Sequence, residues 1–288
     1  MKVLVFGKSG QVGSCLVELM EDQSQLDLIE FNRNDLDLMD IGRINSFITK
    51  HNPDWVINAA AYTAVDKAES DSDRCFRLNA EAPEYIATTC AEINANFIHY
   101  STDYVFDGMG NHPYVEEAKP NPQSVYGKSK LAGELAILAR LSNAIILRTA
   151  WVYAKKGNNF VNTMLRLAEE KPSINVVNDQ FGSPTSAKDL AEVTVSILLD
   201  IANHRVVHQG GVFHATGQGE TTWYEFCKQI MKETFNDETI INAISSTEYP
   251  TPAPRPTYSV LSNQKLKDVY GQELPHWQTA LSYCLQSG

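Results

Sequence analysis

A tyrosine and a lysine stand four residues apart in the segment NPQSVYGKSK (121–130), as Tyr126 and Lys130. If this segment is helical, both side chains lie on one helix face and can meet above a common site. A nearby positive charge lowers the pKa of a phenol from its usual value near ~10, which suits a group that exchanges a proton during a reaction. The pair therefore predicts an acid–base site.

The same spacing recurs at Tyr224 and Lys228 in WYEFCK, so spacing alone does not identify the site. The segment HYSTDYVFDG distinguishes the two pairs, because its Thr102 falls at the end of an apolar run that reads as a buried strand. Ligands of open α/β sheets bind beyond the carboxyl ends of the strands, where a hydroxyl can hydrogen-bond a substrate oxygen. We therefore predict a proton-delivery triad of Thr102, Tyr126 and Lys130, and an ordinary amphipathic helix contact for the second pair.

Short apolar runs alternate with helical patterns in the first half of the chain. This alternation is typical of a parallel sheet whose crossover helices cover both faces. The runs predict strands at 2–6, 26–31, 55–61, 96–101 and 144–148, and the segments between them include helical patterns at 11–20 and 81–95. We predict a doubly wound, Rossmann-like α/β domain over residues 1–150.

The pattern loosens after residue 150. It predicts helices at 159–170, 187–200 and 222–235, short strands at 174–177 and 212–215, and a proline-rich loop at 249–256. We expect residues 151–288 to form a smaller α/β lobe that binds the substrate, with some of its segments returning to the first domain.

The first predicted strand is followed directly by GKSGQVG, which spaces Gly7, Gly10 and Gly13 as G-x-x-G-x-x-G. Such glycines permit a tight turn, close approach of the backbone to a pyrophosphate, and close packing of the next helix, whose N-terminus attracts phosphate charge. The position between a strand and a helix favours a dinucleotide site over a merely structural turn. The wide first gap is typical of extended short-chain dehydrogenases and reductases.

The end of the second predicted strand reads EFNRND and bears on cofactor choice. An acidic side chain there accepts from the ribose 2′-hydroxyl of NAD, whereas an arginine favours the 2′-phosphate of NADP. Arg33, next to Asn32, leans toward NADPH, and the nearby Glu30 and Asp35 keep NADH open as an alternative. A solvent-exposed Arg33 without a ligand is the other interpretation.

The composition excludes several classes of protein. The 288 residues are 43% hydrophobic, which allows a large buried core. Thirty-five acidic against 24 basic residues give a net charge of −11, and without a basic cluster a nucleic-acid partner is not expected. No apolar run is long enough for a signal peptide or a membrane span, so we expect a cytoplasmic protein with no membrane partner.

Two further observations concern covalent frameworks and metals. The five cysteines are dispersed and never form a C-x-x-C pair, which argues against disulfide and zinc frameworks. His204 and His208 have helical spacing, but they lack a neighbouring glutamate and a third ligand. We expect no metal site.

Eight segments, in order and approximate spacing, resemble the dTDP-4-dehydrorhamnose reductase family of the extended short-chain reductases. They span nearly the whole chain: GKSGQVG, NAAAYTAVDKAE, STDYVFDG, VYGKSKLAGE, RTAWVYA, GNNF, NDQFGSPT and YPTPAPRP. NDQFGSPT and YPTPAPRP are the more specific ones, since several of the others also occur in related reductases and epimerases. The resemblance implies reduction of the C4 keto group of dTDP-4-dehydro-6-deoxy-L-mannose to dTDP-L-rhamnose, with NADPH or NADH as the reductant.

The resemblance also implies a set of cofactor contacts. Tyr126 would supply the proton, and Lys130 would bind the nicotinamide ribose and lower the pKa of the tyrosine. The remaining contacts would be Gly10, Gln11 and Val12 at the pyrophosphate, Asp40 and Ile41 at the adenine, and Ala61, Tyr62 and Thr63 at the inner ribose and nicotinamide.

Substrate contacts follow from the same resemblance. Thr102 would hold the sugar O4, Asp103 and Tyr104 would neighbour the sugar, Trp151 would pack on it, and Arg255 and Gln180 would contact the diphosphate. For Trp151 the alternative is a core aromatic, and for Arg255 a solvated loop charge. The prolines around Arg255 stiffen its backbone, however, and a rigid guanidinium suits a phosphate.

Two other functions share this pattern. One is an extended-family epimerase or dehydratase that keeps NAD bound and returns the hydride to its own substrate. The other is a non-catalytic regulatory subunit, since the regulatory β subunit of methionine adenosyltransferase resembles the same reductase fold. The intact triad argues against a pure binding subunit.

Some family members form a dimer bridged by magnesium through glutamates on two helices. This chain has Cys15 and Lys188 at those two positions, one a soft ligand and the other a cation. Glu18 and Asp189 stand close by, but Mg²⁺ needs correctly placed carboxylates, and one residue along a helix turns a side chain by about 100°. We expect a monomer or a dimer formed without a metal bridge.

Overall fold

The computed structural model describes residues 1–234 and 239–286. Within these ranges the larger unit is a six-stranded sheet in the order β10-β5-β4-β3-β1-β2, with every neighbouring pair parallel. This confirms the predicted Rossmann-like α/β fold. The strands are β1 (Lys2–Phe6), β2 (Asp27–Phe31), β3 (Trp55–Asn58), β4 (Asn96–Thr102), β5 (Ile145–Thr149) and β10 (Gly211–His214).

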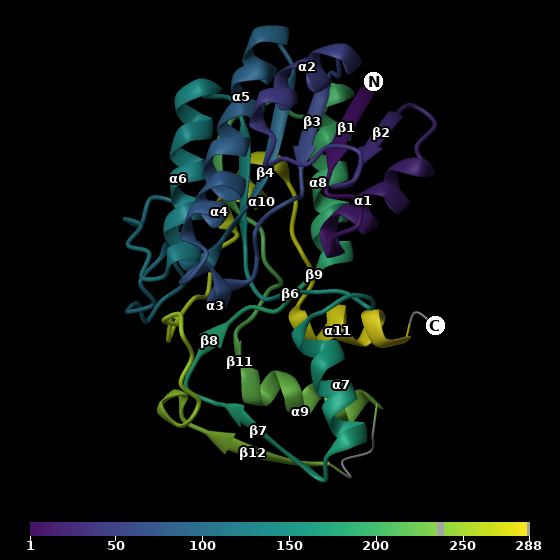
Figure 1. Ribbon diagram of the computed structural model, residues 1–288. Coiled ribbons are helices and arrows are strands. Elements are labelled where there is room, and N and C mark those ends of the chain that lie inside the picture. Colours follow the sequence, from purple (N-terminus) through teal and green to yellow (C-terminus); the bar gives the residue numbers. More distant parts are fainter. Residues whose placement is uncertain (235–238, 287–288) are drawn as a thin grey trace.

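Helices cover both faces of this sheet, as Figure 1 shows. Alternate residues of one strand point to opposite faces, so β1 sends Val3 and Val5 into one core and Leu4 and Phe6 into the other. One face carries α1 (Gln11–Glu21) and α8 (Ala187–Ala202), and the other carries α2 (Ile41–His51), α5 (Ala82–Ile93) and α6 (Val125–Arg140). This burial on both sides explains why the strands read as continuous apolar runs.

Two elements of the larger unit come from the second half of the chain. Strand β10 adds to the sheet beside β5, and helix α8 packs against α1. Short helical segments connect β3 to α5: α3 (Val65–Ala68), α4 (Ser72–Phe76) and the π-helical η1 (Arg77–Glu81). The 3₁₀ turn η2 (Asp103–Val105) follows β4 directly, so the chain turns sharply at the carboxyl end of that strand.

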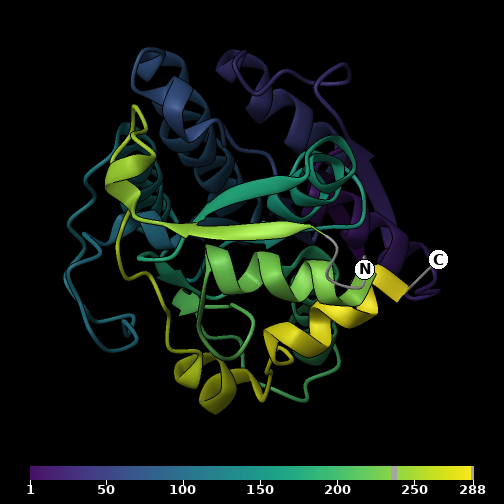
Figure 2. The ribbon, with the colours of Figure 1, turned by 90° about the horizontal axis from the view of Figure 1, so that it is seen from below.

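A smaller α/β lobe lies beyond the carboxyl ends of the strands (Figure 1). Seen from below in Figure 2, β7 and β12 lie side by side next to α9, and α11 packs against α9. Its core includes Tyr153, Phe226 and Trp277. The elements after β5 other than β10 and α8 are β6 (Val152–Tyr153), α7 (Phe160–Glu170), β7 (Ser173–Val177), β8 (Phe181–Gly182), β9 (Thr185–Ser186), β11 (Thr221–Thr222), α9 (Trp223–Thr234), β12 (Ile240–Ile244), η3 (Ser246–Glu248), α10 (Gln264–Tyr270) and α11 (Trp277–Gln286).

Neither a membrane-spanning helix nor a cluster of metal ligands is found in these described ranges. None of the helices there is both long and apolar enough to cross a bilayer. In that part of the chain, no group of three or more His, Cys, Asp or Glu side chains is arranged to hold a metal ion. His204 and His208 follow the end of α8, and the His208 ring packs against Trp55 with 5.5 Å between ring centroids.

A buried ion pair fixes helix α6 to strand β5. Arg148 donates from Nε and Nη2 to the two carboxylate oxygens of Glu134, at 2.9 and 2.7 Å. Both side chains are at most 4% exposed, and the guanidinium also lies over the Phe106 ring, 5.1 Å from its centroid. Because α6 carries both Tyr126 and Lys130, this pair positions the predicted acid–base residues.

Replacing one member of this pair should be costly. We expect Glu134→Gln to lower the free energy of unfolding by about 3–5 kcal/mol, because it leaves a buried guanidinium without its counter-charge. The control is Glu84→Gln, which breaks the exposed 2.8 Å pair with Arg140 and should cost under ~1 kcal/mol. Guanidinium chloride unfolding followed by circular dichroism measures both, and equal losses would contradict a structural role for Glu134.

Candidate active site

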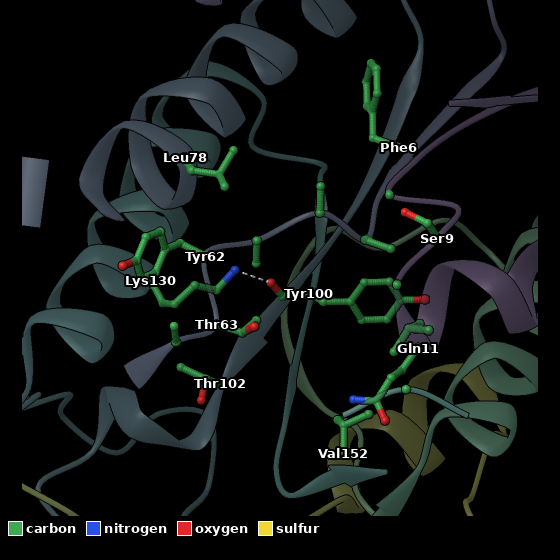
Figure 3. A pocket seen from close by; sticks show the side chains of 18 of the residues that line it. Phe6, Ser9, Gln11, Tyr62, Thr63, Leu78, Tyr100, Thr102, Lys130 and Val152 are labelled. Carbon is green, nitrogen blue, oxygen red and sulfur yellow. Dashed lines mark hydrogen bonds between the residues drawn. The ribbon is translucent and has the colours of Figure 1, made fainter. Parts of the chain in front are cut away.

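A cleft of about 980 Å³ opens at the carboxyl edge of the sheet, between the larger unit and the lobe. Figure 3 shows side chains from both halves of the chain around it. The predicted site residues among its lining are Gly7, Gly10, Gln11, Val12, Arg33, Ala61, Tyr62, Thr63, Thr102, Asp103, Tyr104, Tyr126, Lys130 and Trp151. Residues from six separated segments thus meet in one cavity.

Some predicted site residues lie outside this lining. Gly13 lies behind the wall of the glycine loop, and Gln180 precedes β8. Asp40 and Ile41 follow Leu38 and Met39, which line the cleft. Arg255 stands behind a lining residue, with its guanidinium carbon 5.9 Å from the centre of the Tyr104 ring.

The glycine loop is built so that backbone, not side chain, borders the cleft. Gly7 has φ +87°, and a Cβ there would lie 2.7 Å from the backbone nitrogen of Ala60. A Cβ at Gly13 would lie 2.0 Å from the Gly7 carbonyl oxygen, so the first turn of α1 can approach the loop closely. The helix begins after Gly10 without a side-chain cap, which leaves its first N–H groups for a phosphate.

Buried hydroxyls inside the cleft also fit a polar ligand. Ser101 Oγ and Thr149 Oγ1 lie at the ends of β4 and β5 and have no hydrogen-bond partner among the described residues. Buried polar groups are normally paired, so these two hydroxyls are suited to a ligand with several hydrogen-bonding groups. Together with the glycine cradle, they fit a dinucleotide.

Charged residues near the second strand are already paired in part. Glu30 accepts from Lys8 at 2.9 Å, which turns its carboxylate away from a ribose role. Arg33 contacts Asp37 at 3.0 Å, but its side chain stays 65% exposed and lines the cleft. Asp35 caps the turn by accepting from the Asn32 N–H at 2.9 Å. A side chain that lines the cleft and is largely exposed can contact a 2′-phosphate there, if it exchanges Asp37 for the phosphate.

Thr102 and Tyr126 meet where β4 ends and α6 begins. Ser124 caps α6 by accepting from the Gly127 N–H at 3.1 Å, which puts Tyr126 in the first turn. Gly127 lets this turn approach η2, since a Cβ there would lie 2.2 Å from the Tyr104 carbonyl oxygen. Both residues line the cleft at this point, and the Thr102 hydroxyl acts to lower the pKa of the Tyr126 phenol.

The electrostatics of the pair differ from the sequence expectation. Burial raises the pKa of Tyr126 above its usual value and outweighs the lowering effect of the Thr102 hydroxyl. Lys130 Nζ does not contact the phenol; it donates to the Tyr100 carbonyl at 2.6 Å, the dashed line in Figure 3. Burial lowers the pKa of Lys130 to about 8. In this arrangement Tyr126 holds its proton firmly.

Asp103 is a second buried acid in the cleft. It accepts from the Thr102 hydroxyl at 3.0 Å, and burial raises its pKa to about 6. Its neighbour Tyr104 packs edge-on against Tyr126, with 5.6 Å between ring centroids. Polar groups that can contact a sugar therefore surround the proposed proton donor.

An aromatic stack forms the lobe side of the cleft. The rings of Trp151 and Trp223 are parallel within 8°, with centroids 3.4 Å apart. Trp151 has φ +47°, and a Cβ at Gly182 would lie 2.4 Å from its indole, so the glycine of NDQFGSPT makes room for the ring. Trp223 lines the cleft as well. Sequence reasoning missed it, because its position at the start of α9 reads as an ordinary amphipathic helix.

The second Tyr–Lys pair lies away from this cleft. Lys228 is exposed, sits over the Tyr224 ring at 5.2 Å from its centroid, and contacts Glu225 at 3.4 Å. Neither member of the pair lines the cleft. The spacing that matched Tyr126 and Lys130 therefore gives an aliphatic and cation–π contact on the face of α9.

Comparisons with known proteins agree with this architecture. Residues 1–288 match the family described as RmlD substrate binding domain. A dTDP-4-dehydrorhamnose reductase from Escherichia coli (strain K12) is 40% identical over 292 residues, covering 99% of this chain and 97% of that protein. The Clostridium acetobutylicum dTDP-4-dehydrorhamnose reductase structure matches with a TM-score of 0.93 and 37% identity, covering 100% of this chain and 99% of that one.

A further solved structure was determined with a nucleotide. It is a dTDP-4-dehydrorhamnose reductase from Bacillus anthracis in complex with NADP, with a TM-score of 0.90 and 32% identity. The match covers 100% of this chain and 99% of that chain.

Proposed function

This chain belongs to the dTDP-4-dehydrorhamnose reductase family, and we propose that it uses the cleft at the sheet edge to reduce the C4 keto group of dTDP-4-dehydro-6-deoxy-L-mannose to dTDP-L-rhamnose. The observation that carries the proposal is the meeting of Thr102, Tyr126 and Lys130 beside the glycine loop in one cavity. Residues 1–150 would hold most of the cofactor, and residues 151–288 most of the sugar nucleotide.

NADPH is the proposed cofactor. The glycine loop and the N-terminus of α1 would hold the pyrophosphate, and Arg33 is placed to reach a 2′-phosphate. The Bacillus anthracis relative, whose structure contains NADP, supports this choice. NADH remains the alternative reductant. A bound reduced nicotinamide supplies the hydride, and all other functions in the site belong to side chains of this protein.

Those side chains supply a proton and stabilise developing charge. Tyr126 protonates the oxygen that becomes the new hydroxyl, and the Thr102 hydroxyl hydrogen-bonds the same oxygen. Because Tyr126 is buried, its proton stays in place until the reacting oxygen gains negative charge. Charged Lys130 would assist transfer by stabilising the phenolate that Tyr126 leaves behind.

The lobe would orient the sugar nucleotide. The Trp151 indole, braced by Trp223, offers a flat apolar wall to the 6-deoxy sugar, and Asp103 and Tyr104 offer hydrogen bonds to its hydroxyls. Arg255 pairs with Asp66 at 2.8 Å behind Tyr104 and would exchange this carboxylate for the nucleotide diphosphate. Gln180 would join it, since the backbone N–H of the next residue, Phe181, donates to the Thr257 carbonyl at 2.8 Å.

Coupled turnover tests the reaction. The protein, its upstream epimerase, the dTDP-4-dehydrorhamnose precursor and NADPH should together yield dTDP-L-rhamnose on chromatography. Purified protein that carries stoichiometric NAD and never oxidises added NADPH would instead identify an epimerase or dehydratase. Nucleotide-sugar binding without any turnover would identify a regulatory subunit.

Removing the proton donor tests the assignment of the site. We expect Tyr126→Phe to lower kcat by at least the ~10² to 10⁴ that loss of a general acid typically costs, with little effect on folding. Tyr224→Phe is the matched control and should keep full activity. Equal losses in the two variants would mean that the proton donor lies elsewhere.

Cofactor discrimination depends on Arg33. We expect Arg33→Ala to raise KM for NADPH more than KM for NADH, because a 2′-phosphate is present only in NADPH. Parallel steady-state kinetics with the two reductants measures the difference. Unchanged KM values for both would place Arg33 in solvent and remove it from the site.

We propose that any dimer of this protein forms without a magnesium bridge. Cys15 on α1 is half-buried, and Lys188 on α8 is exposed with its ammonium 3.9 Å from Glu192, so neither supplies a hard oxygen ligand. Light scattering behind size exclusion, with millimolar Mg²⁺ and with EDTA, should give the same mass. A mass that doubles only with magnesium would overturn this.

A further inference from the structure

A buried chain of three polar side chains leads from the core of the sheet to the active-site lysine. Asn58 ends β3, His99 lies in β4, and Lys130 reaches them from α6; none is more than 2% exposed. The Asn58 amide nitrogen is 3.2 Å from His99 Nδ1, and His99 Nε2 is 3.1 Å from Lys130 Nζ. Neither Asn58 nor His99 lines the cleft.

The orientation of the Asn58 amide is fixed by the backbone. The N–H of Ala60 donates to Asn58 Oδ1 at 3.1 Å, so the oxygen faces Ala60 and the amide nitrogen faces His99. An amide nitrogen can only donate, and His99 Nδ1 must therefore accept. Burial lowers the pKa of His99 well below its usual value, so the ring is neutral and carries one proton. That proton is on Nε2.

The proton on His99 Nε2 determines which protonation state of Lys130 fits the hydrogen-bond chain. An ammonium has three donors and no acceptor, and it would face the N–H of the imidazole donor to donor. A neutral amine has a lone pair that accepts from Nε2–H, and it still donates to the Tyr100 carbonyl at 2.6 Å. The hydrogen-bond directions along the chain thus agree only with an uncharged Lys130.

The surroundings of Lys130 favour the same state. Glu134, one turn further along α6, is held by Arg148 of β5, and no carboxylate in the described part of the chain hydrogen-bonds Lys130 Nζ. Glu134 and Cys75 from α4 both act to raise the pKa of Lys130, but burial outweighs them and lowers it, and Tyr126 on α6 is held protonated. A buried ammonium without a hydrogen-bonded counter-ion is costly.

We propose that Asn58 and His99 are positioning residues that hold Lys130 as a neutral amine against the Tyr100 carbonyl, and that Lys130 takes up a proton from solvent when an anionic dinucleotide enters the cleft. The inference rests on the proposed cofactor-binding role of Lys130. The proton arrives from the buffer and stays on Nζ while the nucleotide is bound, so binding and proton uptake are linked. The active-site lysine thus gains its positive charge together with the negative charge of the bound dinucleotide.

The tautomer of His99 tests the premise in the wild-type protein without any ligand. Long-range ¹H–¹⁵N correlation spectra of ¹⁵N-histidine-labelled protein at pH 9, above the lowered pKa of Lys130, with His99 assigned by comparison with His99→Asn, should show the proton on Nε2 alone. A proton on Nδ1 alone, or on both nitrogens, would overturn the proposal, because His99 could not then accept from Asn58 and donate to Lys130.

Proton uptake tests the consequence without any catalysis. Titration calorimetry with NADP⁺ at pH 8.5, in two buffers of different ionisation enthalpy, should report uptake of about one proton in the wild-type protein. Asn58→Asp offers His99 an acceptor in place of a donor, which moves the ring proton to Nδ1 and lets Nε2 accept from an ammonium. At the same pH this variant should take up far fewer protons when NADP⁺ binds. The pH at which its uptake is half-maximal should be higher than in the wild-type protein by about one pH unit or more.

The outcomes separate this inference from the proposed reaction. Tyr126→Phe should lose turnover and keep the wild-type proton uptake. Wild-type protein that binds NADP⁺ at pH 8.5 without uptake, or equal uptake in Asn58→Asp, would refute the role of the Asn58–His99 pair whatever the turnover. Wild-type protein that shows the Nε2–H tautomer and the proton uptake but no turnover would instead refute the proposed reaction and leave the role of the Asn58–His99 pair in place.

Discussion

The close approach of helix α6 to η1 and to η2, the turn that follows β4, is the constraint on which the whole site depends. Two glycines permit it: a Cβ at Gly127 would lie 2.2 Å from the Tyr104 carbonyl oxygen, and one at Gly133 would lie 2.1 Å from the Asn79 carbonyl oxygen. The buried pair of Glu134 with Arg148 then fixes the helix along its length. Any residue larger than glycine at these contacts would push the helix outward and separate its first turn from β4. Proton chemistry at the sheet edge is therefore a consequence of packing.

Much of the fold could be predicted from local pattern, because buried strands and amphipathic helices have distinct periods. The strands expected at 2–6, 26–31 and 96–101 form within one residue of the expected bounds, and so do the helices expected at 11–20 and 159–170. Pattern cannot identify partners. Nothing in the four residues of β10 indicates that they pair with β5 across about sixty residues of sequence, or that α8 covers the same face as α1.

The site residues also fall into those that local sequence predicts and those that only the packed structure reveals. The glycine loop and the strand-end threonine are local signals, and both line the cleft. Trp223, Leu38 and Met39 line it through tertiary contacts that no local motif marks. The direction of the Tyr126 pKa depends on burial and on where Lys130 points, and both are properties of the packed structure. Spacing of four residues established a common helix face without fixing the distance between the two polar atoms.

The buried ionisable groups of the cleft share one electrostatic bias. Burial raises the pKa of Asp103 to about 6 and of Tyr104 to about 12, raises that of Tyr126 further, and lowers that of Lys130 to about 8. Each shift favours the uncharged form, since a low-dielectric pocket penalises any isolated charge. A dinucleotide and a sugar diphosphate are then the largest charges to enter, and the protein groups respond to them. This preference for uncharged forms suits a reductase. Tyr126 holds its proton, and Lys130 gains charge only with its ligand. The site is therefore prepared to donate a proton to the substrate and poorly prepared to remove one.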